Sequence, residues 1–502
     1  MTITFSSSSS SAERAPILFR GPRSTKRIVA ALSTLVLIGA MAGPALTAPA
    51  WAASSSDIQL ESFEKAWQLI NDRYWDPDFG GLDWKAVRDE LRPKAEQAQT
   101  NEELREVLDE MIERLGQSHF GVIPGDAAGP VEDVDEDVGE EGACSPELRR
   151  QLMDRVRSTS EGGSAPAETG LRVGFVDGEV YVTEVEPETS AAEAGIEPGW
   201  RLTEVEGIAV DVVAACFGDD LEEKTLRNLV FRTVTGLLKG EPSTTVSARL
   251  LPPSAEGDEA FDLERRVPGD VETVKFGNLP PVDVRFAVER NEGIVSVRFN
   301  IWMMPIAQLF EELALELDEA DGLLLDLRGN PGGVAGLAPG VAGYLLDEKQ
   351  SLGTLRYRTS SLELVAMPRR VTRSGESIEI FQGPVALLID SQSASTSEIF
   401  AASLQDFGRA RLFGERTMAA ALPAVVEELP NGDYLMHALA DLLRPNGGRI
   451  EGVGVSPDVE VPVTLEGLRA GRDEVRLAAL AWLAEAIAEG KGAAKAEAAS
   501  NP

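Results

Sequence analysis

The sequence is poor in residues that bind metals or form cross-links. Its 502 residues include two histidines and two cysteines, and these do not form the spaced histidine–cysteine clusters that hold zinc. The sequence therefore argues against a metal centre, and we expect no cofactor. Cys144 and Cys216 could form one disulfide outside the cytoplasm, but their positions in the sequence leave this open.

Positive charge is scarce as well. The chain carries 47 lysines and arginines against 83 aspartates and glutamates, which gives a formal net charge of −36. A surface this acidic repels phosphate backbones and anionic lipids, so we expect no nucleic-acid partner and no membrane partner. The oligomeric state is left open by the sequence.

Apolar runs long enough to span a membrane are missing. The run from Ile28 to about Gly43 is too short for a transmembrane helix. It follows a group of basic residues and precedes Ala50-Trp51-Ala52, which is the pattern of a secretory signal peptide cleaved after Ala52. The sequence predicts a signal peptide over residues 1–52 and an exported protein, periplasmic or extracellular, with no stable membrane anchor.

The most informative stretch that is present is a predicted strand-to-helix corner at Ser395. Val385 to Ile389 is an apolar run typical of a buried strand, and a helical pattern begins at Glu398. A serine at such a corner exposes its hydroxyl beside the free N–H groups of the helix start, which suits a nucleophile. The same segment also fits a capping box, Ser395 with Glu398, that only starts a helix.

Other motifs follow in a fixed order around this corner. Upstream, an apolar strand pattern ends in the glycine turn Gly332-Gly333, and downstream come Gly414-Glu-Arg-Thr417 and Gly452-Val-Gly-Val-Ser-Pro-Asp458. In this order and spacing, residues 60 to 485 resemble the serine peptidase family of the C-terminal processing (tail-specific) proteases and the tricorn core protease. The resemblance implies a peptidase that needs no cofactor, acts on peptides or proteins, and has a catalytic core like the ββα spiral of crotonase-like enzymes.

The chain departs from the tail-specific members of that family in one respect. Those members use a serine–lysine dyad, with the lysine in a Thr-Phe-Gly-Lys-Gly-like motif after the serine. The matching segment here is Thr417-Met-Ala-Ala-Ala421, and no lysine lies between Lys349 and Lys491. A serine–lysine mechanism is therefore excluded for any lysine near Ser395 in the sequence.

The resemblance to tricorn-type members supplies another base. In those members a Ser-His pair provides the general base and its orienting hydroxyl, and a glutamate before a Gly-x-Gly-x-x-Pro-Asp motif completes a tetrad. The matching residues here are Ser118, His119 and Glu451, whereas tail-specific members tend to carry glutamine at the last position. The resemblance thus implies that Ser395 is the nucleophile and His119 the base, with Ser118 and Glu451 orienting the imidazole.

The amides of Thr396 and of Gly332 or Gly333 are our candidates for the oxyanion hole, although the glycines could serve only the turn. Structural interpretations exist for other residues too. Ser118 could cap a turn, and Glu451 could be an exposed charge at a strand end. No motif includes His437, so we interpret it as structural. Residues Trp302 to Met304 could line a substrate pocket, but apolar residues at a strand end usually belong to the core.

Residues 170–265 resemble a PDZ domain. Such modules add an extended peptide to a sheet edge, and loop amides hold its terminal carboxylate. The resemblance implies peptide binding, unless the module only gates or braces the active site. The residues that match the loop and strand that receive the peptide are Gly170, Leu171, Gly174 and Phe175.

The expected fold class is α/β, or more broadly α+β multidomain, with alternating strands and helices in the catalytic part. The expected organisation is a signal peptide (1–52), a helical domain that carries Ser118 and His119 (53–124), an acidic linker (125–169), a β-rich PDZ-like domain (170–265), a catalytic domain (266–490) and a disordered tail (491–502). The sequence predicts an exported serine peptidase that cleaves peptides or unfolded proteins and possesses a Ser-His-Ser-Glu tetrad. A catalytically inactive peptide-binding scaffold of the same fold is the alternative, and a hydrolase of small acyl substrates is another.

Overall fold

The computed structural model describes residues 55–125, 144–145, 148–149, 151–152, 167–217, 223–269, 271–275 and 281–500. The expected signal peptide and most of the expected acidic linker lie outside these residues. Within the described part, helices alternate with several separate sheets. The predicted class, a mixed α/β multidomain fold, is confirmed.

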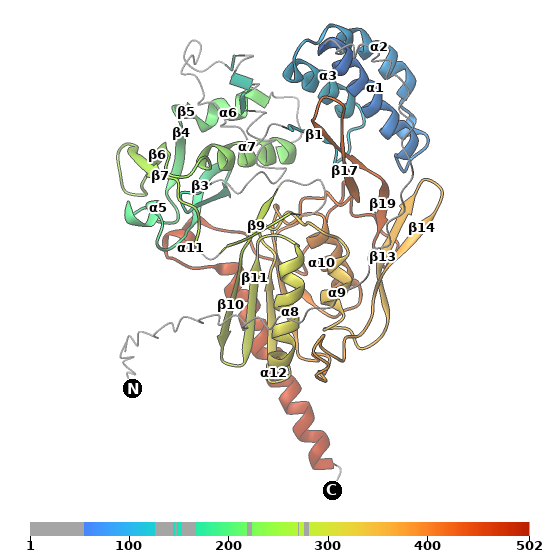
Figure 1. The fold of residues 1–502 in the computed structure, drawn as a ribbon. Coiled ribbons are helices and arrows are strands. Elements are labelled where there is room, and N and C mark those ends of the chain that lie inside the picture. Colours follow the sequence, from blue (N-terminus) through green and yellow to red (C-terminus); the bar gives the residue numbers. More distant parts are fainter. Residues whose placement is uncertain are drawn as a thin grey trace, which may run out of the picture. The chain divides into compact units, whose positions relative to one another are not determined.

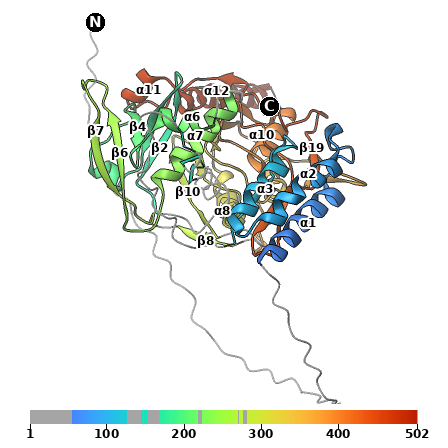
Figure 2. The ribbon, with the colours of Figure 1, turned by 90° about the horizontal axis from the view of Figure 1, so that it is seen from above.

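Three helices form a small bundle near the N-terminus, where they lie side by side (Figure 2). They are α1 (Ser55–Arg73), α2 (Trp84–Gln97) and α3 (Asn101–Glu113), with a short 3-10 helix, η1 (Phe79–Gly81), before α2. Two helices begin at side-chain caps: Asp83 accepts the Ala86 amide at 3.0 Å and Thr100 accepts the Glu103 amide at 3.2 Å. The bundle falls in the region whose apolar spacing predicts helices.

A hairpin from late in the sequence completes the core of this bundle. It consists of β17 (Ala424–Glu428) and β18 (Tyr434–Ala438), and β18 also pairs with β1 (Gly121–Ile123), the strand that follows α3. Leu429 and Leu435 of the hairpin are buried among the apolar side chains of α1, α2 and α3. Figure 1 shows β1 and β17 next to the blue helices. We call the three helices with β1 the helical unit.

A second part, residues 167–269, is a β-rich unit with an antiparallel sheet in the order β2-β3-β4-β6-β7. Its strands are β2 (Leu171–Val176), β3 (Glu179–Val185), β4 (Arg201–Val205), β5 (Ile208–Ala209), β6 (Thr245–Leu251) and β7 (Glu259–Glu264), and its helices are α5 (Ser190–Glu193), α6 (Val210–Phe217) and α7 (Glu223–Leu238). Cys144 and Cys216 form a disulfide that fastens part of the expected acidic linker to α6. The structure thus answers the question that the sequence left open.

The third part is built on a six-stranded sheet in the order β10-β11-β12-β15-β16-β20. These strands are β10 (Phe286–Asn291), β11 (Ile294–Phe299), β12 (Gly322–Asp326), β15 (Val385–Ile389), β16 (Arg411–Gly414) and β20 (Val459–Glu460). All neighbours pair in parallel except β10 and β11. The predicted buried strand Val385–Ile389 is present at its predicted bounds.

Helices cover both faces of this sheet. Side chains alternate between the faces along each strand, and in β12 they are apolar on both, so both faces are buried. Leu323 and Leu325 of β12 pack with α8 (Met304–Leu317), α9 (Leu337–Ala342) and α10 (Thr396–Asp406), and Leu324 packs with α12 (Glu474–Ser500). Figure 1 shows α8, α9 and α10 beside one another. The nucleophile candidate, Ser395, lies where the chain passes from the buried strand β15 to the buried helix α10.

The remaining elements complete this third part, which corresponds to the expected catalytic domain and is called the catalytic part below. They are β8 (Glu272–Val274), β9 (Val282–Val284), β13 (Gln350–Tyr357), β14 (Ser361–Ala366), β19 (Ala440–Leu443) and α11 (Leu465–Arg469). Trp302 and Met303 are buried in the core, whereas Met304 is half exposed at the start of α8. The core interpretation of the first two residues is therefore right.

One prediction about the C-terminus is wrong. The expected disordered tail over residues 491–502 is helical up to Ser500, as the continuation of α12. Alanine, glutamate and lysine dominate this stretch, and their high helix propensity accounts for the continued helix. Within the described residues, every helix is too short or too polar to cross a membrane.

Candidate active site

Ser395 lies at the corner between β15 and α10. It is the N-cap residue of α10 and has a left-handed backbone, with φ 53° and ψ −116°. A non-glycine residue rarely adopts such angles, and strain of this kind persists where surrounding contacts hold the residue in place. The Ser395 amide provides two such contacts, to the Ala420 carbonyl at 2.7 Å and to a Glu398 carboxylate oxygen at 3.1 Å.

Glu398 holds the loop that faces Ser395. Its carboxylate is fully buried and accepts the amides of Ala419 and Ala420, each at 2.9 Å, and the Thr417 hydroxyl. Burial raises the pKa of Glu398, and these hydrogen bonds oppose the rise. The capping contact expected from the sequence is thus one part of a wider network. That network fixes the conformation of the loop of residues 417–421.

Backbone N–H groups from two segments surround Ser395. A Cβ atom on Gly332 would come within 2.6 Å of the Ser395 Cβ and 2.9 Å of the Thr396 nitrogen, so the glycine turn touches the corner. The Gly332 amide is occupied, because it donates to the Asn330 side chain at 3.0 Å. Within the described part of the chain, the amides of Gly333 and Thr396 have no hydrogen-bond acceptor.

Ser118, His119 and Glu451 lie together although they are far apart in the sequence. The Ser118 hydroxyl is 2.7 Å from the Nδ1 atom of His119 and donates to a Glu451 oxygen at 2.9 Å. The other Glu451 oxygen accepts the Ser118 amide at 3.0 Å. Glu451 is almost fully buried, so these contacts are shielded from water. The structure therefore joins three of the four predicted tetrad residues in one chain of contacts, with Ser118 between Glu451 and His119.

The environment of His119 keeps its imidazole neutral. Burial lowers the pKa of His119, and the negative charge of Glu451 opposes this in part. The backbone of His119 is also left-handed, with φ 59°. A neutral imidazole is suited to accept a proton from a nearby hydroxyl.

The two halves of the site are joined through the loop of residues 417–421. The Ala421 amide donates to Glu451 at 2.8 Å, next to Ala420, whose carbonyl accepts the Ser395 amide. Among the described residues, no hydrogen bond runs directly from His119 to the Ser395 hydroxyl. The structure therefore connects the imidazole and the nucleophile through Glu451 and this loop.

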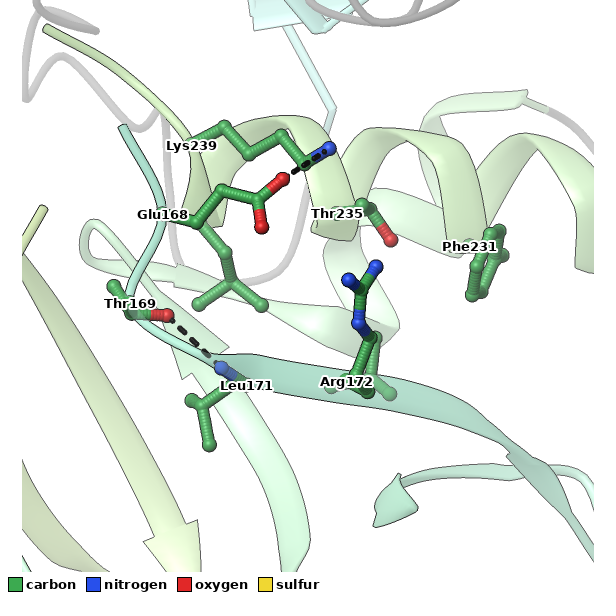
Figure 3. A pocket seen from close by; sticks show the side chains of 9 residues that line it. Glu168, Thr169, Leu171, Arg172, Phe231, Thr235 and Lys239 are labelled. Atoms are coloured by element: carbon green, nitrogen blue, oxygen red, sulfur yellow. Dashed lines mark hydrogen bonds and ion pairs between the residues drawn. The ribbon is translucent and has the colours of Figure 1, made fainter. Parts of the chain in front are cut away.

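The predicted peptide-binding residues lie at the edge of the β-rich unit. Leu171, Gly174 and Phe175 are in β2, which is an end strand of its sheet within the described residues, and Gly170 precedes it with φ 86°. A cavity of about 50 Å³ lies between β2 and α7. Figure 3 shows Arg172 pointing from β2 toward Thr235 of α7.

One side of this cavity carries an ion pair, between Glu168 and Lys239 at 2.9 Å (Figure 3). Burial raises the pKa of Glu168, but the charges of Lys239 and Arg285 outweigh burial and hold that pKa well below its usual range. Glu168 is therefore ionised, and this side of the cavity is charged rather than apolar.

Other residues were interpreted incompletely from the sequence, or not at all. His437 is fully buried in β18, with its Nε2 atom 3.4 Å from Glu427, and takes no part in the cluster around His119. The sequence indicated Glu398 only as a cap, although a carboxylate beside small residues hints at an amide-binding role. It contained no signal for the buried pair of Arg105 and Asp433, which joins α3 to the β17–β18 hairpin.

Comparison with known protein families gives two matches. Residues 294–461 match the model of peptidase family S41, and residues 59–113 match the tricorn protease C1 domain. The first match covers five strands of the six-stranded sheet, all except β10, together with Ser395, and the second covers helices of the helical unit.

Curated relatives match along most of the chain. A carboxyl-terminal-processing protease of Picosynechococcus sp. is 26% identical over 443 residues, which covers 87% of this chain and 90% of the relative. A chloroplastic C-terminal processing peptidase of Tetradesmus obliquus is 27% identical over 446 residues, covering 84% and 81%. These matches favour a peptidase over an inactive scaffold.

Solved structures share the fold. The photosystem II D1 C-terminal processing protease has 21% identity and a TM-score of 0.50, with 83% of this chain and 98% of the other covered. Mature CPAF, in a complex with lactacystin, has 15% identity and a TM-score of 0.52, with 83% and 96% covered. At these identities the similarity concerns the fold.

Proposed function

We propose that this chain, whose residues 294–461 match the model of peptidase family S41, is a serine-type peptidase that cleaves peptides or unfolded proteins with Ser395 as nucleophile and His119 as general base. Ser118 and Glu451 orient the imidazole. The observation that carries this proposal is the contact of Glu451 with Ser118 on one side and with the 417–421 loop on the other. That carboxylate links the base to the loop that holds the Ser395 amide.

The proton transfers follow from this arrangement. Nε2 of His119 takes the proton of the Ser395 hydroxyl as the oxygen attacks the peptide carbonyl carbon. The imidazolium then returns the proton to the leaving amine, and an acyl-enzyme remains. A water molecule repeats the sequence, giving its proton to His119 and its oxygen to the acyl group, which frees Ser395. Water is the single co-reactant.

The hydroxyl of Ser118 fixes the tautomer of the imidazole in this scheme. It donates to one Glu451 oxygen and lies at hydrogen-bond distance from Nδ1 of His119. Because the Ser118 hydroxyl donates its hydrogen to Glu451, the neutral imidazole carries its hydrogen on Nδ1 and donates it to the Ser118 oxygen, which leaves Nε2 free to accept the Ser395 proton. The Glu451 charge then stabilises the imidazolium through that hydroxyl. The lowered pKa of His119 leaves the base neutral before the reaction.

The oxyanion is assigned to the amides of Gly333 and Thr396. Thr396 directly follows Ser395, and the Gly333 carbonyl accepts the Thr396 hydroxyl at 2.9 Å. The two amides have no acceptor in the described part of the chain, so neither must break a hydrogen bond to receive a developing charge. The Gly332 amide is the weaker candidate, because Asn330 already occupies it. The absence of a side chain at Gly332 instead allows the glycine turn to lie close to Ser395.

Substrate recognition is assigned to the edge of β2. An extended peptide would add to this edge beside α7, with its terminal carboxylate at the amides of Gly170 and Leu171. The Leu171 amide has only a long contact, 3.4 Å, to the Thr169 hydroxyl, which a carboxylate could replace. We include in the proposal a C-terminal preference and export from the cytoplasm, where the Cys144–Cys216 disulfide would persist.

The deciding experiment is hydrolysis of a quenched-fluorescent peptide library by the protein and by its Ser395→Ala and His119→Ala variants. We expect both changes to abolish turnover, whereas His437→Asn, the matched change at the other histidine, retains it if the variant stays folded by circular dichroism. Turnover that survives His119→Ala would overturn the assignment of the base. Hydrolysis of small esters without peptide cleavage would overturn the substrate class.

A further inference from the structure

A carboxylate from the catalytic part is fully buried inside the helical unit. Asp433 lies in the turn of the β17–β18 hairpin and has no exposed surface. Its two oxygens accept the Nε and Nη2 atoms of Arg105 at 3.0 and 2.6 Å. They also accept the Gly125 amide at 3.0 Å and the Asn431 side chain at 2.8 Å. A buried charge with four donors is a rigid anchor.

The hairpin around Asp433 is embedded in the helical unit. Leu429 and Leu435 flank the turn and are buried among the helices. The Asn431 amide donates to the Ser62 hydroxyl of α1 at 2.9 Å, and its carbonyl accepts the Asn101 side chain of α3 at 3.3 Å. The turn is thus attached to the first and third helices by hydrogen bonds as well as by apolar packing.

The segment that carries His119 is hydrogen-bonded to Asp433 from both of its flanks. Arg105 is in α3, which precedes Ser118, and Gly125 follows β1, which begins directly after Phe120. β1 is itself paired with β18, with Gly121 opposite Met436. The base is therefore carried by a short segment whose two flanks are both tied to Asp433.

The first strand of the hairpin follows the loop that contacts Ser395. β17 starts at Ala424, shortly after Ala420 and Ala421, which contact Ser395 and Glu451 respectively. The hairpin thus runs from the loop that faces Ser395 into the core of the unit that supplies His119. No other described strand pairing joins the helical unit to the catalytic part.

From these contacts we infer that Asp433 and Arg105 are positioning residues, which set the place of His119 relative to Ser395. The inference rests on the proposed function, because it assigns the pair a role in assembling that site. If the pair is broken, one buried charge lacks its partner and the hairpin turn loses its directional contacts. A displacement of about 1 Å at the base costs roughly a hundredfold in rate, even when the substrate still binds.

The test compares Asp433→Asn, Arg105→Gln and Arg105→Lys in the full chain. The matched control is Asp406→Asn, because Asp406 and Arg444 form a similar bidentate pair at 2.7 and 3.0 Å within the catalytic part, without a helical-unit partner. We measure kcat and KM with a peptide, the pH dependence of the rate at which a fluorophosphonate labels Ser395, and the melting temperature of each variant.

We expect Asp433→Asn and Arg105→Gln to lower kcat by about a hundredfold with KM changed less than about threefold, and to weaken the rise of labelling with pH that His119 causes. Arg105→Lys, which keeps the charge, should recover part of kcat. The control should keep both kcat and the pH dependence. If Asp433→Asn does not fold, the comparison of kcat between Arg105→Lys and Arg105→Gln tests the positioning role.

Two results distinguish a failure of the positioning role from a failure of the proposed tetrad. An unchanged kcat and pH profile in folded Asp433→Asn or Arg105→Gln, in a protein whose His119→Ala variant is inactive, would overturn the positioning role alone. A wild-type protein whose labelling does not depend on His119 would instead overturn the proposed tetrad, and the positioning role with it.

Discussion

Glu451 binds Ser118 with both of its carboxylate oxygens, one through the Ser118 amide at 3.0 Å and the other through its hydroxyl at 2.9 Å. A carboxylate held by two donors from one residue has little freedom to rotate. The hydroxyl is in turn 2.7 Å from the imidazole of His119. The charge of Glu451 therefore reaches the imidazole through a fixed hydroxyl rather than by direct contact.

The first prediction concerns this three-residue unit. Ser118→Ala and Glu451→Gln should each lower kcat on the order of a hundredfold, the lower end of what a positioned general base contributes. Because the residues act on one imidazole, the double variant should be little worse than either single one. Steady-state kinetics of the four proteins measures this. Multiplicative losses would show that the two side chains act independently.

The second prediction concerns pH. Burial lowers the pKa of His119, so the base stays neutral to lower pH than free histidine does. The rate should therefore rise with pH and reach half its maximum below about 6.5, the ordinary value for histidine. A pH profile of kcat/KM at constant ionic strength checks this. A midpoint near 9 would require a different base.

The third prediction concerns the effect of the Glu451 charge on the pH at which the rate is half-maximal. The Glu451 carboxylate raises the pKa of His119 against the effect of burial. Removing its charge in Glu451→Gln removes that favourable interaction with the imidazolium, so the midpoint should move further down. The residual rate of this variant, followed against pH, gives the shift. A midpoint that moves up would contradict the assigned contact.

The fourth prediction concerns the glycine turn. An alanine at Gly332, where φ is 100°, would place its Cβ 2.6 Å from the Ser395 Cβ and 2.9 Å from the Thr396 nitrogen. Gly332→Ala should reduce labelling of Ser395 by about a hundredfold or more, as for loss of an oxyanion donor. Gly329→Ala is the matched control, because φ is 71° there but the Cβ has open space. Equal losses in both variants would indicate backbone strain alone.

The fifth prediction concerns the disulfide. Cys144 and Cys216 are 72 residues apart in the sequence, and a cross-link over such a loop typically contributes roughly 2–4 kcal/mol to the stability of the folded unit. Dithiothreitol should lower the melting temperature of the β-rich unit in the wild type. It should have no such effect on the Cys144→Ser/Cys216→Ser double variant. An unchanged wild-type transition under full reduction would contradict this.

Local features of the site were predictable from the sequence because they depend on neighbouring residues. The apolar run Val385–Ile389 forms β15 at those bounds, and Ser395 lies at the corner that follows. Strand and helix patterns express side-chain alternation within a short segment, so they can be recognised without knowing the fold. The helix that continues to Ser500 shows the limit of such patterns, since the helix propensity of its residues, rather than an apolar period, accounts for that end.

The sequence by itself determined the chemical inventory: a serine at a strand-to-helix corner, no lysine near it, two histidines and two cysteines. Only the tertiary structure decided which residues meet. It joined Ser118 to Glu451, engaged the Gly332 amide with Asn330, and buried Asp433 beside Arg105. These contacts join residues that are distant in the chain, except for that of Gly332 with Asn330, which depends on the shape of the turn. The packing of the hairpin against the helices selects the long-range partners, and no local pattern records that packing.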